Sequence, residues 1–135
     1  EHFARVRQVD TMKRQQFIKG INQIAQEGAL QIFQEYNTGM EEIIVGVVGV
    51  LQFDVLKYRL ENEYNVEIRL ENLPYEYIRW IENEEIDLDK LTGTSDMKKV
   101  KDLKGRPLLL FVNEWSIRMT VDRNDGLKLT EFGRS

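Results

Sequence analysis

The sequence predicts an α+β protein, and three observations support this. Two segments carry apolar residues at the three- and four-residue spacing of an amphipathic helix. Short runs of β-branched and aromatic residues precede and follow each of these segments. A turn signal, Asn-Thr-Gly, separates the second run from the third. The first half is therefore predicted as strand, helix, strand, strand, helix, strand.

The first strand and the first helix are predicted within residues 3–28. Residues 3–9 form the strand, and Asp10 or Thr11 supplies the side-chain oxygen that caps the helix. The apolar stripe of the helix falls at i, i+4, i+7 and i+8, on Phe17, Ile21, Ile24 and Ala25. Gly28 can adopt the left-handed conformation that ends a helix.

Two further strands are predicted to form a hairpin. Residues 29–36 form the second strand, and Asn37 and Gly39 supply the turn. Residues 42–48 form the third strand, whose apolar run lacks alternation. That pattern is typical of a strand covered on both faces.

The second helix, predicted over residues 50–64, has two apolar faces. One face is formed by Phe53, Leu56, Leu60 and Tyr64. The nearly opposite face is formed by Leu51, Val55 and Tyr58. A helix on a sheet needs only one apolar face, so we expect the rest of this chain or a neighbouring domain to cover the second. With a fourth strand at residues 65–71, the order is that of a ferredoxin-like split βαβ sandwich.

The second half is predicted as an additional α/β segment that packs on the first. Its predicted strands are residues 75–83, 106–113 and 127–132, and its predicted short helices are residues 87–91 and 96–103. Residues 114–124 fit a helix or a strand, and we favour a helix that stops near Gly126. No linker or repeat separates the halves. We therefore expect one domain over residues 1–135, with halves at 1–73 and 74–135.

Two glycines in the apolar run raise the question of a phosphate-binding loop. Such a loop needs Lys and a hydroxyl residue after its second glycine, but Gly49 is followed by Val50 and Leu51. A dinucleotide-binding fingerprint needs three glycines in a set pattern, which are absent here. We therefore expect a structural motif formed by Gly46, Gly49, Leu51 and Phe53. In this motif Gly46 allows close packing and Gly49 makes a tight strand-to-helix junction.

Composition excludes several kinds of chemistry. The chain has no Cys and a single His, His2, so disulfides, thiolate sites and His-based nucleophile systems have no basis. We expect no catalytic, cofactor-binding or metal-binding residue in these 135 residues, and a cytoplasmic location. The start without Met, on a strand-like segment, indicates a piece of a longer protein.

The net charge of −4 is unevenly distributed. Residues 82–89 hold five acids and no base, whereas residues 98–106 hold five basic residues and one acid. Basic residues are candidates for contacts with RNA phosphates. The candidates are Arg5, Arg7, Lys13, Arg14, Lys19, Lys98, Lys99, Lys101, Lys104 and Arg106. A solvated surface role is the alternative for each of them.

The stretch GVVGVLQFDVLKYRLENEYNVE, residues 46–67, resembles the C-terminal domain of the bacterial peptide chain release factor 3 family. QFIKGINQIAQEGALQIF, residues 16–33, and the pair Arg79–Trp80 fit the same family. The first half is also similar, more loosely, to domain III of elongation factor G. The resemblance covers about half of the chain strongly.

The resemblance implies a role in translation termination. Members of this family are GTPases whose GTPase domain and β-barrel precede this domain, so GTP with Mg would bind outside this chain. The family's C-terminal domain docks on the ribosome, near small-subunit protein and ribosomal RNA, and packs against its own GTPase and β-barrel domains. The intact factor promotes dissociation of the release factors that read stop codons. Two alternatives remain, a stand-alone ferredoxin-like RNA-binding or regulatory module and a small metabolic enzyme.

Overall fold

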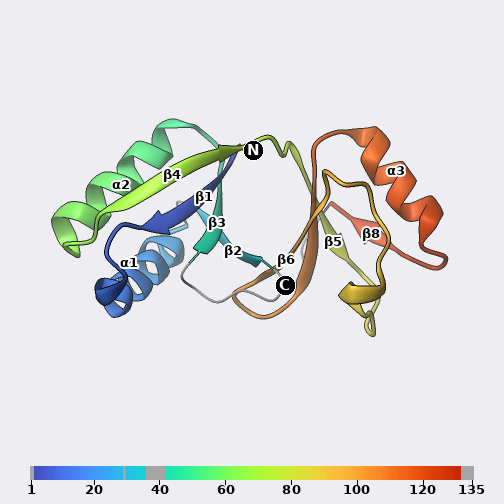
Figure 1. The fold of residues 1–135 in the computed structure, drawn as a ribbon, viewed down its shortest axis with the longest axis horizontal. Coiled ribbons are helices and arrows are strands. Elements are labelled where there is room, and N and C mark those ends of the chain that lie inside the picture. The colour runs from blue at the N-terminus through green and yellow to red at the C-terminus, as the bar shows by residue number, and fades with distance from the viewer. Residues whose placement is uncertain (1, 29, 36–41, 132–135) are drawn as a thin grey trace. The chain divides into compact units, whose positions relative to one another are not determined.

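The computed structural model describes residues 2–28, 30–35 and 42–131. The chain divides into two compact units, Glu1–Leu73 (unit 1) and Pro74–Ser135 (unit 2). Each unit combines an antiparallel sheet with helices, so the predicted α+β class is confirmed (Figure 1). Ala29, Tyr36 and the predicted turn at Asn37 and Gly39 lie outside the described residues.

Unit 1 has the predicted order of elements. They are β1 (His2–Gln8), the 3-10 turn η1 (Thr11–Lys13), α1 (Arg14–Gln26), β2 (Gln31–Glu35), β3 (Glu42–Val47), α2 (Leu51–Glu63) and β4 (Ile68–Leu73). Its strands lie in the order β4-β1-β3-β2, and each neighbouring pair is antiparallel. Asp10 caps η1 by accepting a hydrogen bond from the Met12 amide, and Gly28 has a φ of 82° just after α1. Both signals at the ends of this helical segment were therefore predicted correctly.

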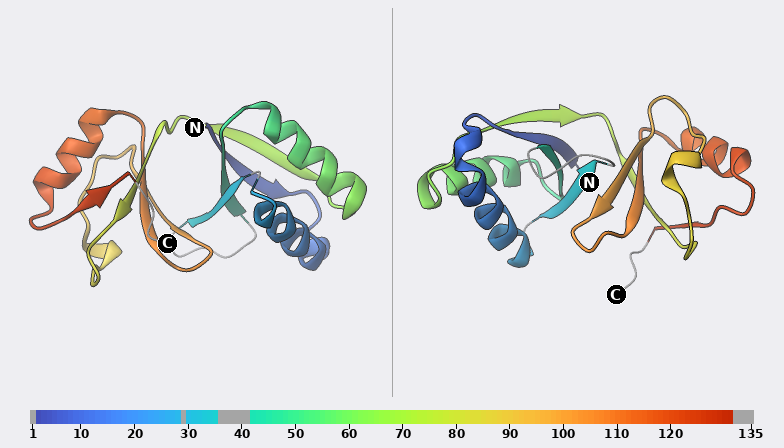
Figure 2. Two further views of the ribbon diagram at one scale, coloured as in Figure 1. Left: turned by 180° about the vertical axis from the view of Figure 1, so that it is seen from behind. Right: turned by 60° about the horizontal axis from the view of Figure 1, so that its bottom comes forward.

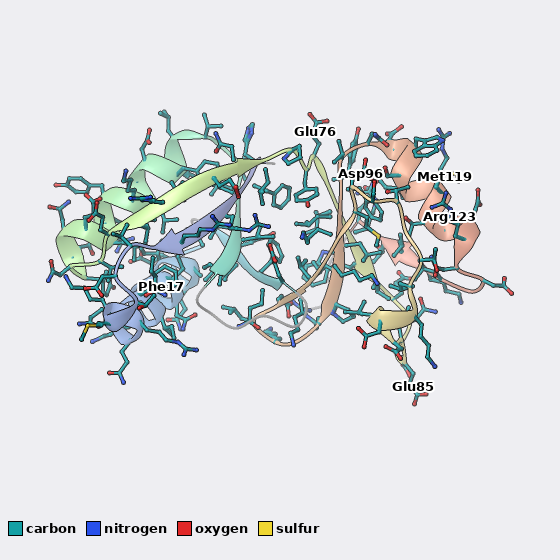
Figure 3. All side chains as sticks on the ribbon, viewed as in Figure 1. Phe17, Glu76, Glu85, Asp96, Met119 and Arg123 are labelled. Atoms are coloured by element: carbon teal, nitrogen blue, oxygen red, sulfur yellow. The ribbon has the colours of Figure 1, made fainter. Side chains whose placement is uncertain are left out.

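Both helices of unit 1 cover the same face of its sheet (Figures 1 and 2). Strand alternation directs Ala4 and Val6 of β1 and Ile43 and Val45 of β3 towards the helices. The helices contribute the predicted apolar stripes, Phe17, Ile21 and Ile24 from α1 and Phe53, Leu56 and Leu60 from α2. Phe17 is labelled in Figure 3. These side chains form one buried core.

The third strand is buried on both faces, as its unbroken apolar run predicts. Ile43 and Val45 lie in the core on the helix side, and Ile44 is fully buried on the other side. On that other side a Cβ at Gly46 would lie only 3.0 Å from the ring of Phe3. Gly46 therefore allows close packing, as expected.

The expectation for Gly49 is wrong in one respect. Gly49 does lie between β3 and α2, but its φ is not in the left-handed region, and a Cβ there would meet no atom within 4 Å. The junction is held instead by Gln52, whose Oε1 accepts hydrogen bonds from the amides of Val48 and Gly49 at 3.1 and 3.2 Å. A side chain, and not a glycine conformation, fixes this corner.

Unit 2 is a second antiparallel sheet with one long helix. Its elements are β5 (Tyr77–Ile81), the 3-10 turn η2 (Leu88–Lys90), β6 (Lys98–Asp102), β7 (Pro107–Phe111), α3 (Glu114–Arg123) and β8 (Leu129–Thr130). The strand order within unit 2 is β6-β7-β5-β8. Among the described residues, no helix of either unit has the length and apolar character needed to cross a membrane.

The helix predicted over residues 96–103 is wrong, because residues 98–102 form strand β6. Val100 of β6 is opposite Leu108 of β7, and both are fully buried. Gly105, with a φ of 82°, makes the tight turn between the two strands. The strand depends on pairing with β7, which the local composition, with three Lys residues, does not indicate.

The helix predicted over residues 114–124 is confirmed as α3. Asn113 caps it by accepting a hydrogen bond from the Ser116 amide at 2.8 Å. The buried Ser116 hydroxyl donates to Asp96 at 3.1 Å, and Asp96 is labelled beside α3 in Figure 3. This polar contact ties the helix to the loop that precedes β6.

Candidate functional site

The basic residues singled out from the sequence fall into both units. Those in unit 1 are Arg5, Arg7, Lys13, Arg14 and Lys19, and those in unit 2 are Lys98, Lys99, Lys101, Lys104 and Arg106. Within each unit the structure separates cations that bind other parts of the fold from cations directed to solvent. This separation decides which of them can contact a ligand.

Arg5 is an internal clamp in unit 1. Its Nε donates to Glu35 Oε1 at 3.0 Å, its Nη2 also contacts Glu35, and its Nη1 donates to Glu71 Oε2 at 2.8 Å. Hydrogen bonds to Glu35 and the negative charge of both carboxylates raise the pKa of Arg5, although burial opposes this. The guanidinium therefore links β1 to β2 and β4 and is not available for phosphate.

Lys13 also has an internal role. Its Nζ donates to the backbone oxygen of Asn65 at 3.0 Å. Asn65 has a φ of 56° and lies just after α2. Lys13 thus fastens the start of one helix to the end of the next.

Three other cations of unit 1, Arg7, Arg14 and Lys19, are exposed. Arg7 lies directly opposite Arg69 across the β1–β4 pair, and like charges in that arrangement are destabilising. Both arginines line a hollow of about 340 Å³, which also contains Gln8 and Glu71. The buried side-chain amide of Gln8 has no hydrogen-bond partner. Arg69 was missed from the sequence, because only the strand register places it beside Arg7.

In unit 2, Lys99 and Arg106 serve the fold. Lys99 Nζ donates to the backbone oxygens of Leu88 and Leu91 at 2.6 and 3.0 Å, so it holds the η2 loop against β6. Arg106 Nε donates to Asp102 Oδ2 at 2.7 Å, and its guanidinium lies 4.7 Å from the ring centroid of Trp80. Both side chains have a structural role that their basic character does not indicate.

The turn of the β6–β7 hairpin presents two of the candidate cations of unit 2. Asp102 Oδ1 accepts from the amides of Lys104 and Arg106, each at 2.9 Å, which fixes the turn. Lys104 is exposed and Lys101 is half-buried. We call Lys101 and Lys104, with the exposed Leu103 between them, the hairpin tip.

Over the described residues, no three His, Asp or Glu side chains gather as a metal-binding group. The acidic run of residues 82–89 instead contains Asp87, which caps η2 by accepting from the Asp89 amide. The acidic run thus has a structural contact at Asp87.

Both units are of the α+β class, and unit 2 presents a basic hairpin. Comparison with known proteins gives the family: residues 1–121 match the family described as "Class II release factor RF3, C-terminal domain". The chain belongs to this family.

Curated relatives agree with this assignment. "Peptide chain release factor 3" of Symbiobacterium thermophilum is 46% identical over 127 residues, 94% of this chain and 24% of that protein. The protein of the same name from Lactobacillus acidophilus is 43% identical over 131 residues, 97% of this chain and 24% of that protein. The chain thus spans about a quarter of the length of these relatives.

Proposed function

We propose that this chain is a ribosome-docking domain of a cytoplasmic translation-termination GTPase. The intact factor would promote dissociation of stop-codon-reading release factors after peptide release. The observation that carries this proposal is the family match over residues 1–121, joined by relatives named peptide chain release factor 3. The resemblance in residues 16–33 and 46–67 supports the same proposal.

Catalysis would belong to another part of the polypeptide. The relatives are about four times as long as this chain, which leaves room for GTPase and β-barrel domains. GTP and Mg would bind there, since residues 46–51 lack the Lys and hydroxyl residue of a phosphate loop. The 135-residue chain is therefore expected to leave GTP unhydrolysed.

Ribosome contact would use the cations that the fold leaves accessible. Of the candidate residues, these are the hairpin tip in unit 2 and Lys19 in unit 1, joined by the exposed Arg69. Arg7 and Arg14 are exposed too, but each already has an interaction within the fold. Phosphate attraction needs charge at the surface more than exact side-chain chemistry. Lys98 lies next to the tip in sequence, but it already has an interaction within the fold. Small-subunit protein and ribosomal RNA are the proposed partners.

The test uses the full-length protein with Lys101→Ala and Lys104→Ala together. We expect weaker ribosome binding at low salt, and a salt slope that falls by about one for each phosphate that the protein no longer neutralises. Lys128→Ala, an exposed lysine outside the hairpin, is the matched control and should leave affinity unchanged. Unchanged affinity of the double variant would mean that the hairpin tip is an ordinary solvated surface that does not contact the ribosome.

A stand-alone RNA-binding or regulatory module is the second candidate, and the exposed Arg69, which lines a hollow of unit 1, favours it. Under this candidate, the 135-residue chain alone binds single-stranded RNA with steep salt dependence, and Arg69→Gln weakens that binding. Under the first proposal, the chain alone binds such RNA weakly and the ribosome tightly only within the longer protein. Titration of both proteins with an oligonucleotide and with ribosomes separates the two.

A further inference from the structure

Unit 2 contains a small hollow beside the end of β5. Its volume is about 170 Å³, and the residues that line it include Trp80, Asn83, Glu84, Arg106 and Pro107. We call it the Trp80 hollow. Sites that enclose a whole small molecule usually measure about 300–1,000 Å³. The Trp80 hollow therefore suits one ring of a larger ligand.

Two flat side chains form a stacking surface in this hollow. The guanidinium carbon of Arg106 lies 4.7 Å from the centroid of the Trp80 ring. Arg106 Nε donates to Asp102 Oδ2 at 2.7 Å, which fixes the guanidinium over the ring. Both Trp80 and Arg106 are only half-buried. Unpaired RNA bases stack on aromatic rings and on guanidinium planes, so the pair offers a surface for a base that is formed before binding.

The segment of residues 82–84 brings a carboxylate to the hollow. Asn83 Nδ2 donates to the backbone oxygen of Gly126 at 2.9 Å, and Asn83 Oδ1 accepts from the Lys128 amide at 2.8 Å. The Glu82 amide donates to the backbone oxygen of Lys128 at 2.9 Å. These bonds hold the segment, and the exposed Glu84 follows it as a lining residue. An ionised carboxylate offers only acceptors, so Glu84 can bind two neighbouring N–H donors of a ligand.

Positive charge lies next to the hollow. Lys104 is exposed and stands two positions before Arg106 in the same turn, because the amides of both residues bind Asp102 Oδ1. An RNA nucleotide combines a flat base with a phosphate, which Lys104 would attract. A basic peptide would suit Glu84, but Lys104 and Arg106 would repel it. The charges therefore favour RNA as the occupant.

We propose that the Trp80 hollow binds the base of an unpaired guanosine in RNA. Guanine presents two N–H donors side by side on one edge, and these match the two oxygens of the Glu84 carboxylate. Uracil presents a single N–H between two carbonyl oxygens, which a carboxylate repels. The base would stack against the Trp80–Arg106 pair while its phosphate lies near Lys104. This inference deepens the proposed ribosome contact and rests on it for the source of the RNA.

The tryptophan content of the chain gives a direct test. Trp80 and Trp115 are the two tryptophans, so Trp115→Phe, at a position that is 54% exposed, leaves Trp80 as the fluorescent probe. The 135-residue chain with this change would be titrated at low salt with a short oligouridine that carries one central guanosine. An oligonucleotide of the same length with uridine alone is the reference ligand.

We expect the guanosine oligonucleotide to quench Trp80 and to bind about tenfold more tightly than oligouridine. Glu84→Gln should keep the quenching and lose this preference, because an amide offers one acceptor oxygen in place of two. Glu85→Gln is the matched control, since it removes the same charge at an exposed neighbour outside the residues that line the hollow (labelled in Figure 3). It should keep the preference.

A second measurement uses the full-length protein on ribosomes. A reagent that modifies the N1 and N2 positions of unpaired guanines should find one guanosine of ribosomal RNA that the wild-type protein protects. The Glu84→Gln variant should leave this guanosine reactive, and the Glu85→Gln variant should protect it.

Three results of the titration would overturn the proposal. Trp80 fluorescence that neither oligonucleotide changes would mean that no base enters the hollow. Equal affinity for the two oligonucleotides would mean attraction by charge alone. Tighter binding of an arginine-rich peptide, with quenching of Trp80, would assign the hollow to a basic protein partner.

The two measurements also separate this proposal from the proposed function. Ribosome binding without any protection that depends on Glu84 would overturn the guanosine site and leave ribosome docking intact. Failure of the wild-type protein to bind ribosomes would refute the docking function. The oligonucleotide titration uses no ribosomes, so it would then decide on the guanosine site by itself.

Discussion

Gly20 marks the closest approach of the two helices of unit 1. It lies in the middle of α1 and is fully enclosed. A Cβ built at this position would lie 2.8 Å from Leu60 Cδ2 and 2.8 Å from Tyr64 Cγ. Ordinary van der Waals contact begins at 3.4 Å. Gly20→Ala therefore requires α2 or these side chains to move.

Two opposing effects decide the sign of this change. Alanine stabilises a helix by about 0.8–1 kcal/mol relative to glycine. Overpacking a filled core costs about 1–3 kcal/mol, and Leu60 is fully buried. We expect Gly20→Ala to destabilise the chain by about 1 kcal/mol and Gly20→Val by about 3 kcal/mol.

Urea unfolding of the 135-residue chain, followed by circular dichroism, measures these differences. Gln23→Ala, on the exposed side of the same helix, is the matched control and should change the free energy of unfolding by less than about 0.5 kcal/mol. Leu60→Val should recover part of the stability in the Gly20→Ala background, because it removes volume at the clash. If Gly20→Ala stabilises the chain as much as helix propensity predicts, the two helices are not in the close contact described.

Three further predictions concern charge and backbone. Arg5→Met should destabilise the chain by about 2 kcal/mol because it removes the cation that the carboxylates of Glu35 and Glu71 contact, and a urea midpoint equal to wild type would mean that solvent replaces these contacts. Hydrogen bonds from Arg59 lower the pKa of Glu63 in the folded protein. The ionised Glu63 therefore stabilises the fold at pH values above the ordinary carboxyl pKa, and this stabilisation is lost as the pH falls through the lowered pKa. Glu63→Gln should therefore reduce the loss of stability in an acid titration of unfolding, and an unchanged acid limb would contradict this. Gly49→Ala should leave the melting temperature unaltered, and a clear decrease would show a conformational need that the backbone does not display.

Much of unit 1 was predictable from the sequence because its signals are local. The stripe containing Phe17 and Ile21 follows from helical spacing, and Asp10 and Gly28 act on residues next to them. The two-faced character of α2 was also visible in the spacing of its apolar residues. In each case the residues that define the element lie within a few positions of one another.

The corrections arise where the partner is distant in sequence. Strand β6 exists because β7 pairs with it, and local composition alone favoured a helix there. The carboxylates that hold Arg5 lie 30 and 66 residues away, and the carbonyls that hold Lys99 lie 11 and 8 residues away. A list of basic residues cannot separate such cations from accessible ones, because both have the same composition. The register that joins Arg7 to Arg69 is equally invisible before the sheet is known.

The Asp102 turn has a kinetic consequence for the hairpin tip. Three hydrogen bonds to one carboxylate hold the backbone that carries Lys104 before any partner arrives. Binding of a partner would therefore order only the side chains of Lys101 and Lys104. It would need no slow rearrangement of the loop after the first encounter. The association rate constant of the hairpin tip should then approach the limit set by electrostatically guided diffusion. Most differences in affinity among variants of the hairpin tip should therefore arise in the dissociation rate constant.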